Sequence, residues 1–190
     1  SRLGFEMKTN RNSLGDFFFF FFLSIVASYF IMNLQIITYN CESFNKNIDI
    51  VRLLLKKCDI LLLQETLLTD CSLFKIGDTG SDFDYFAVPA VRKDDCFIGK
   101  ASGGLAIIFR KSFSKIINPF YHSERIMGVH IACQEISYLL LNVYFPCDYG
   151  NDKSFVSYQS TLADLDNIYG SEKNANIICA GDFNCDPAKG

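Results

Sequence analysis

The sequence predicts an α/β fold, in which parallel strands alternate with helices. Residues 34–39 (LQIITY) and 60–63 (ILLL) are short apolar runs, and runs of this length are typical of buried strands. Between them, apolar residues recur every three or four positions, which is the period of a helix with one apolar face. A helix between two short buried strands favours a parallel pair and an open α/β core.

The remaining elements can be predicted in chain order. The first helix follows the turn-like segment Asn45-Lys46-Asn47, and its apolar positions are Ile48, Val51, Leu55 and Cys58. Next we expect a surface loop over 69–82, a strand over 85–91 and a polar connection over 94–100. Three more strands are predicted over 104–110, 127–133 and 138–144. A second amphipathic helix over 154–169, with Ser154 as its cap, leads to a last buried strand over 176–180.

Composition sets the class of protein. The 190 residues suffice for one domain, and 49% apolar with 21% charged residues supports a packed core. The formal net charge of −3 excludes a strongly basic, histone-like DNA binder, but it is compatible with an enzyme that holds phosphates through a metal. The eight cysteines include no CxxC pair, which disfavours zinc ribbons and predicts buried free thiols in a reducing compartment.

The N-terminal segment, residues 1–32, differs from the rest of the chain. It contains six consecutive phenylalanines, Phe17 to Phe22, and 14 of the 16 residues from 17 to 32 are apolar. This run is slightly shorter than a membrane helix requires. Three interpretations stay open: a translated T-rich tract before a natural start at Met32, a signal or membrane anchor, or an element of the domain. We divide the chain into an extension, 1–32, and a domain, 33–190.

Polar residues follow four of the predicted buried strands. These strand ends read Asn40-Cys41-Glu42, Gln64-Glu65, Asn142-Val143-Tyr144 and Asp182-Phe183-Asn184. Ligand sites of open α/β sheets lie beyond the carboxyl ends of strands, so these side chains are expected to converge. An Asn or Asp after a single strand is usually a turn former, but four such ends in order are more specific. Their oxygens suit Mg²⁺ or Mn²⁺, which can polarise a phosphoryl oxygen.

Five segments together resemble the motifs of a known superfamily. They are TYNCESF (38–44), DILLLQETLL (59–68), SGGLAIIFRK (102–111), LLLNVYFPCD (139–148) and IICAGDFNCDP (177–187). In this order they resemble the endonuclease/exonuclease/phosphatase superfamily. Within it, they are most similar to the N-terminal endonuclease domain of non-LTR retrotransposon polyproteins, which also carry a reverse transcriptase. The resemblance covers residues 33–190 and implies a four-layer α/β sandwich.

The resemblance also implies roles for individual residues. Glu65 would be the principal metal-binding carboxylate, assisted by Asn40, with Glu42 in the outer sphere of the metal. Tyr144 would face the phosphate, and Asp182 would orient or deprotonate the attacking water.

Three further residues complete the predicted site. By the same resemblance, Asn184 would hold the phosphate or Asp182, and Gly103 and Gly104 would have structural roles before a strand. The implied cofactor is Mg²⁺ or Mn²⁺ with no small-molecule cofactor, and the implied partner is DNA.

The chain departs from the family pattern at its C-terminal end. The family domain continues with a further Asp and a Ser-Asp-His run, whereas this chain stops at Gly190 and has only His122, in a predicted loop, and His130, in a predicted strand. Neither His follows an Asp, so no catalytic His is assigned. Cys147 stands where relatives outside the retrotransposon group have a phosphate-contacting Asn. We therefore expect an incomplete sandwich, a C-terminally truncated domain and a marginally stable chain with little activity.

Three functions remain in competition. The first is a metal-dependent DNA endonuclease of the retrotransposon type, inactive if truncation removes essential parts. The second is another phosphoesterase of the superfamily, acting on inositol phosphates, sphingomyelin or RNA tails. The third is a non-catalytic, membrane-associated remnant. The protein would be nuclear or cytoplasmic if the phenylalanine run is an artefact, and membrane-associated or secreted otherwise.

Overall fold

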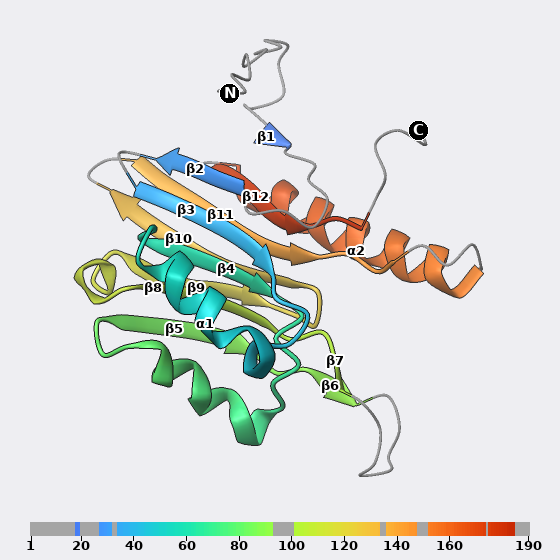
Figure 1. The fold of residues 1–190 in the computed structure, drawn as a ribbon. Coiled ribbons are helices and arrows are strands. Elements are labelled where there is room, and N and C mark those ends of the chain that lie inside the picture. Colours follow the sequence, from blue (N-terminus) through green and yellow to red (C-terminus); the bar gives the residue numbers. More distant parts are fainter. Residues whose placement is uncertain are drawn as a thin grey trace, which may run out of the picture.

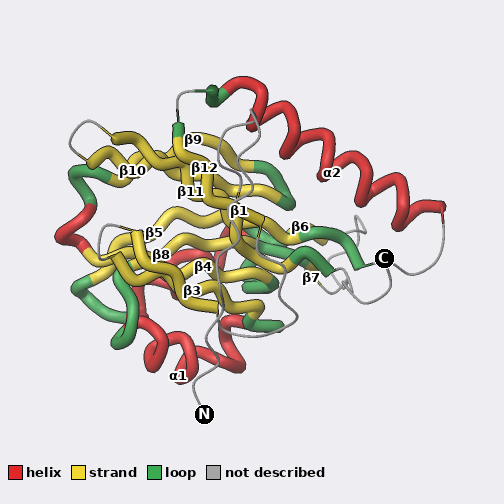
Figure 2. Tube along the Cα trace, turned by 90° about the horizontal axis from the view of Figure 1, so that it is seen from above, coloured by secondary structure: helices red, strands yellow, loops and turns green. Residues whose placement is uncertain are grey.

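In the computed structural model, two β-sheets pack face to face between two helices (Figure 1). The structure describes residues 18–19, 27–31, 34–92, 101–133, 136–147, 152–173 and 175–184. Helix α1 (Phe44–Leu55) covers the outer face of one sheet, and helix α2 (Asp152–Ser171) covers the outer face of the other (Figure 2). This four-layer arrangement confirms the predicted α/β sandwich.

The first sheet has the strand order β2-β3-β4-β8-β5. Its strands are β2 (Ala27–Ile31), β3 (Leu34–Asn40), β4 (Ile60–Gln64), β8 (Leu105–Arg110) and β5 (Phe83–Val88). Strands β3 and β4 are parallel and connected through α1, which confirms the predicted parallel pair. All five residues of β4 are buried, because this strand is central in the sheet and both of its faces are covered.

The second sheet has the order β1-β12-β11-β10-β9. Its strands are β1 (Phe18–Phe19), β12 (Asn176–Asp182), β11 (Ile136–Tyr144), β10 (Ile126–Cys133) and β9 (Ile117–His122). Strands β11 and β12 are parallel and connected through α2, so each sheet contains one β-α-β unit. A separate two-stranded sheet pairs β6 (Val91–Arg92) with β7 (Ala101–Ser102).

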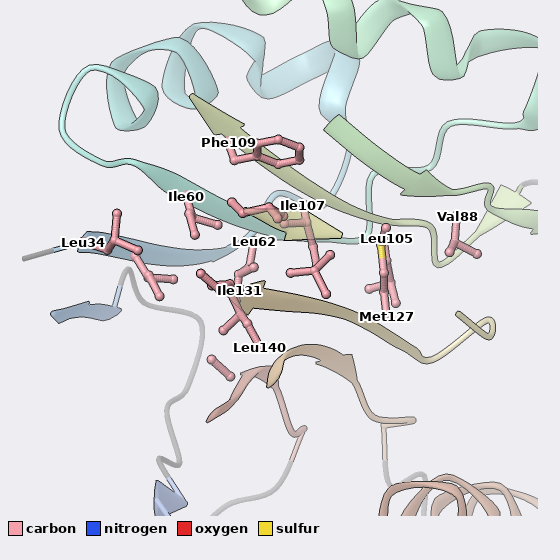
Figure 3. Close-up of a cluster of buried hydrophobic side chains, with 14 residues drawn as sticks. Leu34, Ile60, Leu62, Val88, Leu105, Ile107, Phe109, Met127, Ile131 and Leu140 are labelled. Atoms are coloured by element: carbon pink, nitrogen blue, oxygen red, sulfur yellow. The ribbon is translucent and has the colours of Figure 1, made fainter. Parts of the chain in front are cut away.

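Three apolar clusters hold the four layers together. The largest lies between the sheets, where alternate residues of β4 and β8, such as Ile60, Leu62 and Ile107, meet Ile131 and Leu140 of the second sheet (Figure 3). The intervening residues of β4 face α1, and those of β11 face α2. This alternation of faces follows from the two-residue period of a strand.

Several predicted elements differ from the structure. The first helix begins at Phe44 and ends at Leu55, so the segment expected to precede it lies inside it, with a non-helical backbone at Asn47. The second helix begins at Asp152, so Ser154 lies within the helix and is not its cap. The expected surface loop over 69–82 contains a 3₁₀ helix, Asp70–Thr79 (η1), because Ile76 packs into the core against α1.

One strand prediction and one loop prediction were also wrong. The strand expected over 85–91 is divided into β5 and β6, and Pro89 lies between them, where proline cannot donate a ladder hydrogen bond. His122 is the last residue of β9 and not part of a loop, whereas His130 lies in β10 as expected. Strand β9 contains Pro119 and lies at the edge of its sheet, which explains why its sequence lacks a strand signal.

The described part of the N-terminal segment consists of strands β1 and β2. Strand β1 pairs with β12 and strand β2 pairs with β3. Residues 1–17 and 20–26 and the polar connection over 94–100 lie outside the described residues. Among the residues that are described, no helix is long and apolar enough to cross a membrane. The three interpretations of this segment stay predictions.

Candidate active site

The polar strand ends of the two sheets meet at one edge of the sandwich. In the first sheet, Asn40 pairs with Gln64, so the end of β3 lies beside the end of β4. In the second sheet, Tyr144 pairs with Asp182 at the ends of β11 and β12. Because β12 packs across β3 and β4, these two parallel pairs end close together. The topology thus brings four distant segments to one place.

Hydrogen bonds join the candidate side chains across the sheets. The amide Nδ2 of Asn40 donates to Oε1 of Glu65 at 3.0 Å and to Oδ2 of Asp182 at 2.7 Å. The hydroxyl of Tyr144 donates to the same Glu65 oxygen at 2.8 Å. All four residues are half-buried, so they are screened from bulk water on one side only. Such a cluster can bind a ligand that arrives from solvent.

Asn184 orients the Asp182 carboxylate. The backbone N–H of Asn184 donates to Oδ1 of Asp182 at 2.9 Å, while Asn40 holds Oδ2. The side-chain amide of Asn184 donates to the carbonyl of Phe145 at 2.8 Å and accepts a hydrogen bond from the Cys147 thiol at 3.2 Å. Both carboxylate oxygens of Asp182 are therefore held in place.

Glu42 and the two glycines contribute through the backbone. The Glu42 side chain is exposed, and its N–H donates to Oδ1 of Asn40 at 3.1 Å. The carbonyls of Gly103 and Gly104 accept the N–H groups of Leu67 and Thr66, each at 3.1 Å. Both glycines have positive φ, and a Cβ on Gly104 would overlap the Thr66 hydroxyl. The structure thus places these glycines directly behind the Glu65 segment.

Strained backbone is concentrated at this edge. The described non-glycine residues with left-handed φ are Glu42 (48°), Glu65 (53°), Leu67 (54°) and Asn184 (46°). In a regular strand, Glu65 would face away from the side on which Gln64 points. Its left-handed φ interrupts the alternation, and its carboxylate reaches Asn40 and Tyr144. Strain of this kind often occurs where a side chain must be aimed at a ligand.

The electrostatic environment keeps Tyr144 protonated. Burial raises the pKa of its hydroxyl most strongly, and the hydrogen bond to Glu65 and the charge of that carboxylate raise it further. The Arg125 guanidinium lies 4.7 Å from the centre of the Tyr144 ring and acts in the opposite direction on this pKa. Tyr144 is therefore a neutral hydrogen-bond donor at ordinary pH.

The donor set fits a small, hard cation. Glu65 and Asp182 supply carboxylate oxygens beside the Asn40 amide, and Mg²⁺ typically binds through one or two carboxylates while it keeps several waters. Within the described part of the chain, the hydrogen bonds to Glu65 end on Oε1, which leaves Oε2 for coordination. No cluster of three or more His, Cys, Asp or Glu side chains suited to a metal occurs among the described residues. Two carboxylates and one amide suit a largely hydrated ion more than an all-protein cage.

Sequence reasoning missed several residues of this region. The sequence marks Gln64 and Asn142 only as parts of polar strand ends, although a polar residue on the apolar face of a buried strand is a signal in itself. Arg125, which stacks on Tyr144, lies in the turn between β9 and β10 and carries no comparable signal.

The fold and the oxygen donors together define a two-sheet α/β protein with a carboxylate site at the strand ends, as phosphoester hydrolases have. The chain matches the Endonuclease/Exonuclease/phosphatase family over residues 37–190 and belongs to this family. Its members are hydrolytic nucleases and phosphatases. No curated protein sequence matches the chain.

Solved structures share the fold at low sequence identity. The 3′ phosphatase NExo from Neisseria, bound to a product DNA hairpin, superposes with a TM-score of 0.61 at 19% identity, over 82% of this chain and 63% of that chain. The human nocturnin catalytic domain with a bound sulfate gives a TM-score of 0.58 at 14% identity, over 85% of this chain and 68% of that chain. A mannosyl-6-phosphatase from Bacteroides thetaiotaomicron gives 0.54 at 20% identity, over 82% and 67%. The chain thus spans about two thirds of these relatives.

Proposed function

We propose that the protein hydrolyses phosphodiester bonds with the help of Mg²⁺ or Mn²⁺, as a DNA endonuclease of the non-LTR retrotransposon type. The observation that carries this proposal is the cluster of Asn40, Glu65, Tyr144 and Asp182, which are joined by hydrogen bonds from four strands in two sheets. The motifs that surround these residues resemble the retrotransposon branch more than other branches of the family. The NExo structure, in which a related protein binds DNA, is compatible with a DNA substrate.

The proposed metal ligands are Glu65 and Asn40, with Glu42 in the outer sphere. When bound, the cation would polarise a phosphoryl oxygen and stabilise the charge on the leaving group. Asn40 uses its Nδ2 to hold both carboxylates, so its Oδ1 is the atom available to a cation or to the Glu42 N–H. The amide thereby separates two like charges and orients Glu65.

Asp182 is the proposed general base. Its two oxygens are oriented by Asn40 and Asn184, and a water next to the carboxylate could pass its proton to either oxygen. Tyr144, protonated and held on Glu65, can turn its hydroxyl toward an equatorial phosphate oxygen and stabilise the negative charge there. Asn184 completes the set by fixing Asp182.

A plasmid-nicking assay tests this function. With Mg²⁺ or Mn²⁺, the protein should convert supercoiled plasmid to nicked circles, and EDTA should stop the reaction. Glu65→Gln preserves the shape of the side chain but removes its charge, so we expect at least about a 100-fold loss of rate. Asp49→Asn is the matched control, because Asp49 is exposed on α1 and its side chain keeps 91% of its surface accessible. This variant should nick at the wild-type rate.

The same assay separates the competing functions. Phosphate release from inositol phosphates or mannose 6-phosphate, phosphocholine release from sphingomyelin, or shortening of RNA tails, in each case without nicking, would favour another phosphoesterase. Folded protein that cuts none of these substrates would favour a non-catalytic role. Equal nicking by wild type and Glu65→Gln would contradict the proposed site.

A further inference from the structure

We propose that Gln64 and Asn142 are positioning residues that form an amide bridge between the sheets and set the contact of Tyr144 with Glu65. This inference concerns the proposed active site, and its activity measurement rests on the proposed function. Both bridge residues are buried, with exposed fractions of 1% for Gln64 and 0% for Asn142. They lie on the face of each sheet that packs against the other sheet.

All four amide hydrogens of the bridge have acceptors. Asn142 Nδ2 donates to the carbonyls of Leu63 and Ala106, each at 3.0 Å. Gln64 Nε2 donates to Oδ1 of Asn142 at 2.6 Å and to the Thr38 hydroxyl at 3.0 Å. Because the two carbonyls can only accept, Asn142 must turn its NH₂ group toward them, and its oxygen then faces Gln64. The network therefore has one orientation.

The bridge lies where the pairing of β4 with β8 ends in the first sheet. Leu63 and Ala106 are the last register pair of β4 and β8, and beyond this pair the chain turns into Glu65. Asn142 of the second sheet binds both carbonyls at that point. Asn142 thus connects the second sheet to the last residue pair of β4 and β8, just before the chain reaches Glu65.

The contact between Tyr144 and Glu65 in the proposed site is the next one after the bridge, where β11 and the end of β4 meet. Asn142 and Tyr144 are two residues apart on β11 and so project from one face, while Gln64 and Glu65 are adjacent. The bridge joins Asn142 to Gln64 at 2.6 Å, and the site joins Tyr144 to Glu65 at 2.8 Å. A shift of one sheet along the other would break both contacts together. The buried bridge resists such a shift, whereas the half-buried contact alone is open to water.

An apolar pair in place of the bridge would hold the sheets together without directed hydrogen bonds. The neighbouring layer of the same interface consists of Leu62 and Leu140, which interact by packing alone. Apolar packing tolerates small displacements, whereas an amide bridge with four directed hydrogen bonds does not. Hydrogen bonds with fixed geometry at this layer suit the task of aligning the catalytic pair that follows.

A double-mutant cycle tests whether the bridge acts through Tyr144. Asn142→Leu keeps the branched shape of the side chain but removes its hydrogen bonds, and Tyr144→Phe removes the contact with Glu65. In plasmid nicking, Asn142→Leu should lower kcat about 10-fold with KM changed by less than roughly twofold. In the Tyr144→Phe background, the same substitution should lower kcat by less than about threefold, while the shift in Tm should be equal in both backgrounds.

A spectroscopic measurement tests the positioning without activity. The chain has nine tyrosines and can be labelled with 3-fluorotyrosine, and the ¹⁹F resonance missing from Tyr144→Phe identifies Tyr144. Asn142→Leu should shift this resonance. Thr38→Val, which removes only one acceptor of Gln64, should shift it less and serves if Asn142→Leu does not fold. Thr161→Val is the matched control, because its buried hydroxyl binds the Ser157 carbonyl within α2, and it should leave the resonance unchanged.

Two results would overturn the inference. One is an unchanged Tyr144 resonance in a folded Asn142→Leu or Thr38→Val protein. The other is an equal loss of kcat from Asn142→Leu in both backgrounds, which would indicate a purely structural bridge. Absence of nicking in wild type would instead refute the proposed function, and the resonance would still decide the positioning.

Discussion

Asn40 is the residue that organises the site. Its amide donates to Glu65 and to Asp182, so a neutral group lies between two carboxylates that would otherwise repel each other. Its oxygen accepts the N–H of Glu42, which fixes the orientation of the amide. Asn is therefore suited to this position, whereas an Asp here would add a third negative charge and lose both donors.

Tyr144 provides a prediction at the scale of one residue. Tyr144→Phe keeps the ring against Arg125 but removes the donor to Glu65, so we expect a loss of kcat of about 100-fold in plasmid nicking. Because the pKa of this hydroxyl is raised, the group stays protonated in the wild type at neutral and moderately alkaline pH. Wild type and Tyr144→Phe should therefore differ by a constant factor between about pH 6 and 9. A factor that varies with pH over this range would contradict a neutral donor role.

The two β-α-β units are the elements that build the site. Each places the carboxyl ends of a parallel strand pair side by side, and the residues on the inner face of each strand change there from apolar to polar. On β3 the inner face runs through Ile36, Thr38 and Asn40, and on β11 through Leu140, Asn142 and Tyr144. The polar layer above the apolar layers follows from the two-residue period of these strands.

Gly181 provides a prediction for strand β12. Its φ of 147° and a contact of any Cβ with the backbone of Val143 leave no room for a side chain. Gly181→Ala should therefore lower the free energy of unfolding by at least about 2 kcal/mol, and it should also move Asp182 and reduce nicking. Urea denaturation measures the first effect.

Gly170→Ala is the control for this prediction. Gly170 lies in α2, and a Cβ there would have no neighbour within 4 Å. Alanine is the better helix former, so this variant should be neutral or more stable by up to about 1 kcal/mol. Equal stability of the two variants would show that the close approach of β12 to β11 is not required.

At the scale of the whole molecule, three thiols are buried between a sheet and the helix that covers it. Cys41 and Cys58 lie between the first sheet and α1, and Cys179 lies between the second sheet and α2. Burial raises the pKa of each of these thiols to about 12, from an ordinary value of 9.0. Cys71, by contrast, is exposed.

These thiols predict a loss of stability in alkali. Between about pH 9 and 12 the unfolded chain has released thiol protons that the folded protein retains, so the unfolded state binds fewer protons. The free energy of unfolding should therefore fall as the pH rises through this range, as measured by urea denaturation. Cys179→Ala should reduce the slope, and Cys71→Ser should leave it unchanged. A slope that Cys179→Ala does not alter would contradict this account.

Much of the fold could be predicted because the pattern of apolar residues along a segment indicates which of its faces are buried. Apolar runs identified β3, β4, β8 and β12, since strands covered on both faces must be apolar along their length. Helical periodicity identified α1 and α2, although their ends were misplaced where Asn47 and Ser154 lie inside the helices. The edge strand β9 and the 3₁₀ helix η1 carry no regular pattern and were missed.

By itself, the sequence determined the α/β class, the order of the buried strands that carry the site and the polar residues that end them. The motif residues Asn40, Glu65, Tyr144 and Asp182 could be selected because they stand at polar strand ends, within motifs that resemble those of the family. Only the tertiary structure decided which of them touch, that Glu42 takes part through its backbone, and that Gln64 and Asn142 bridge the sheets. The physical reason is that strand patterns are encoded by neighbours in sequence, whereas these contacts join residues far apart in the chain and exist only once the two sheets have packed.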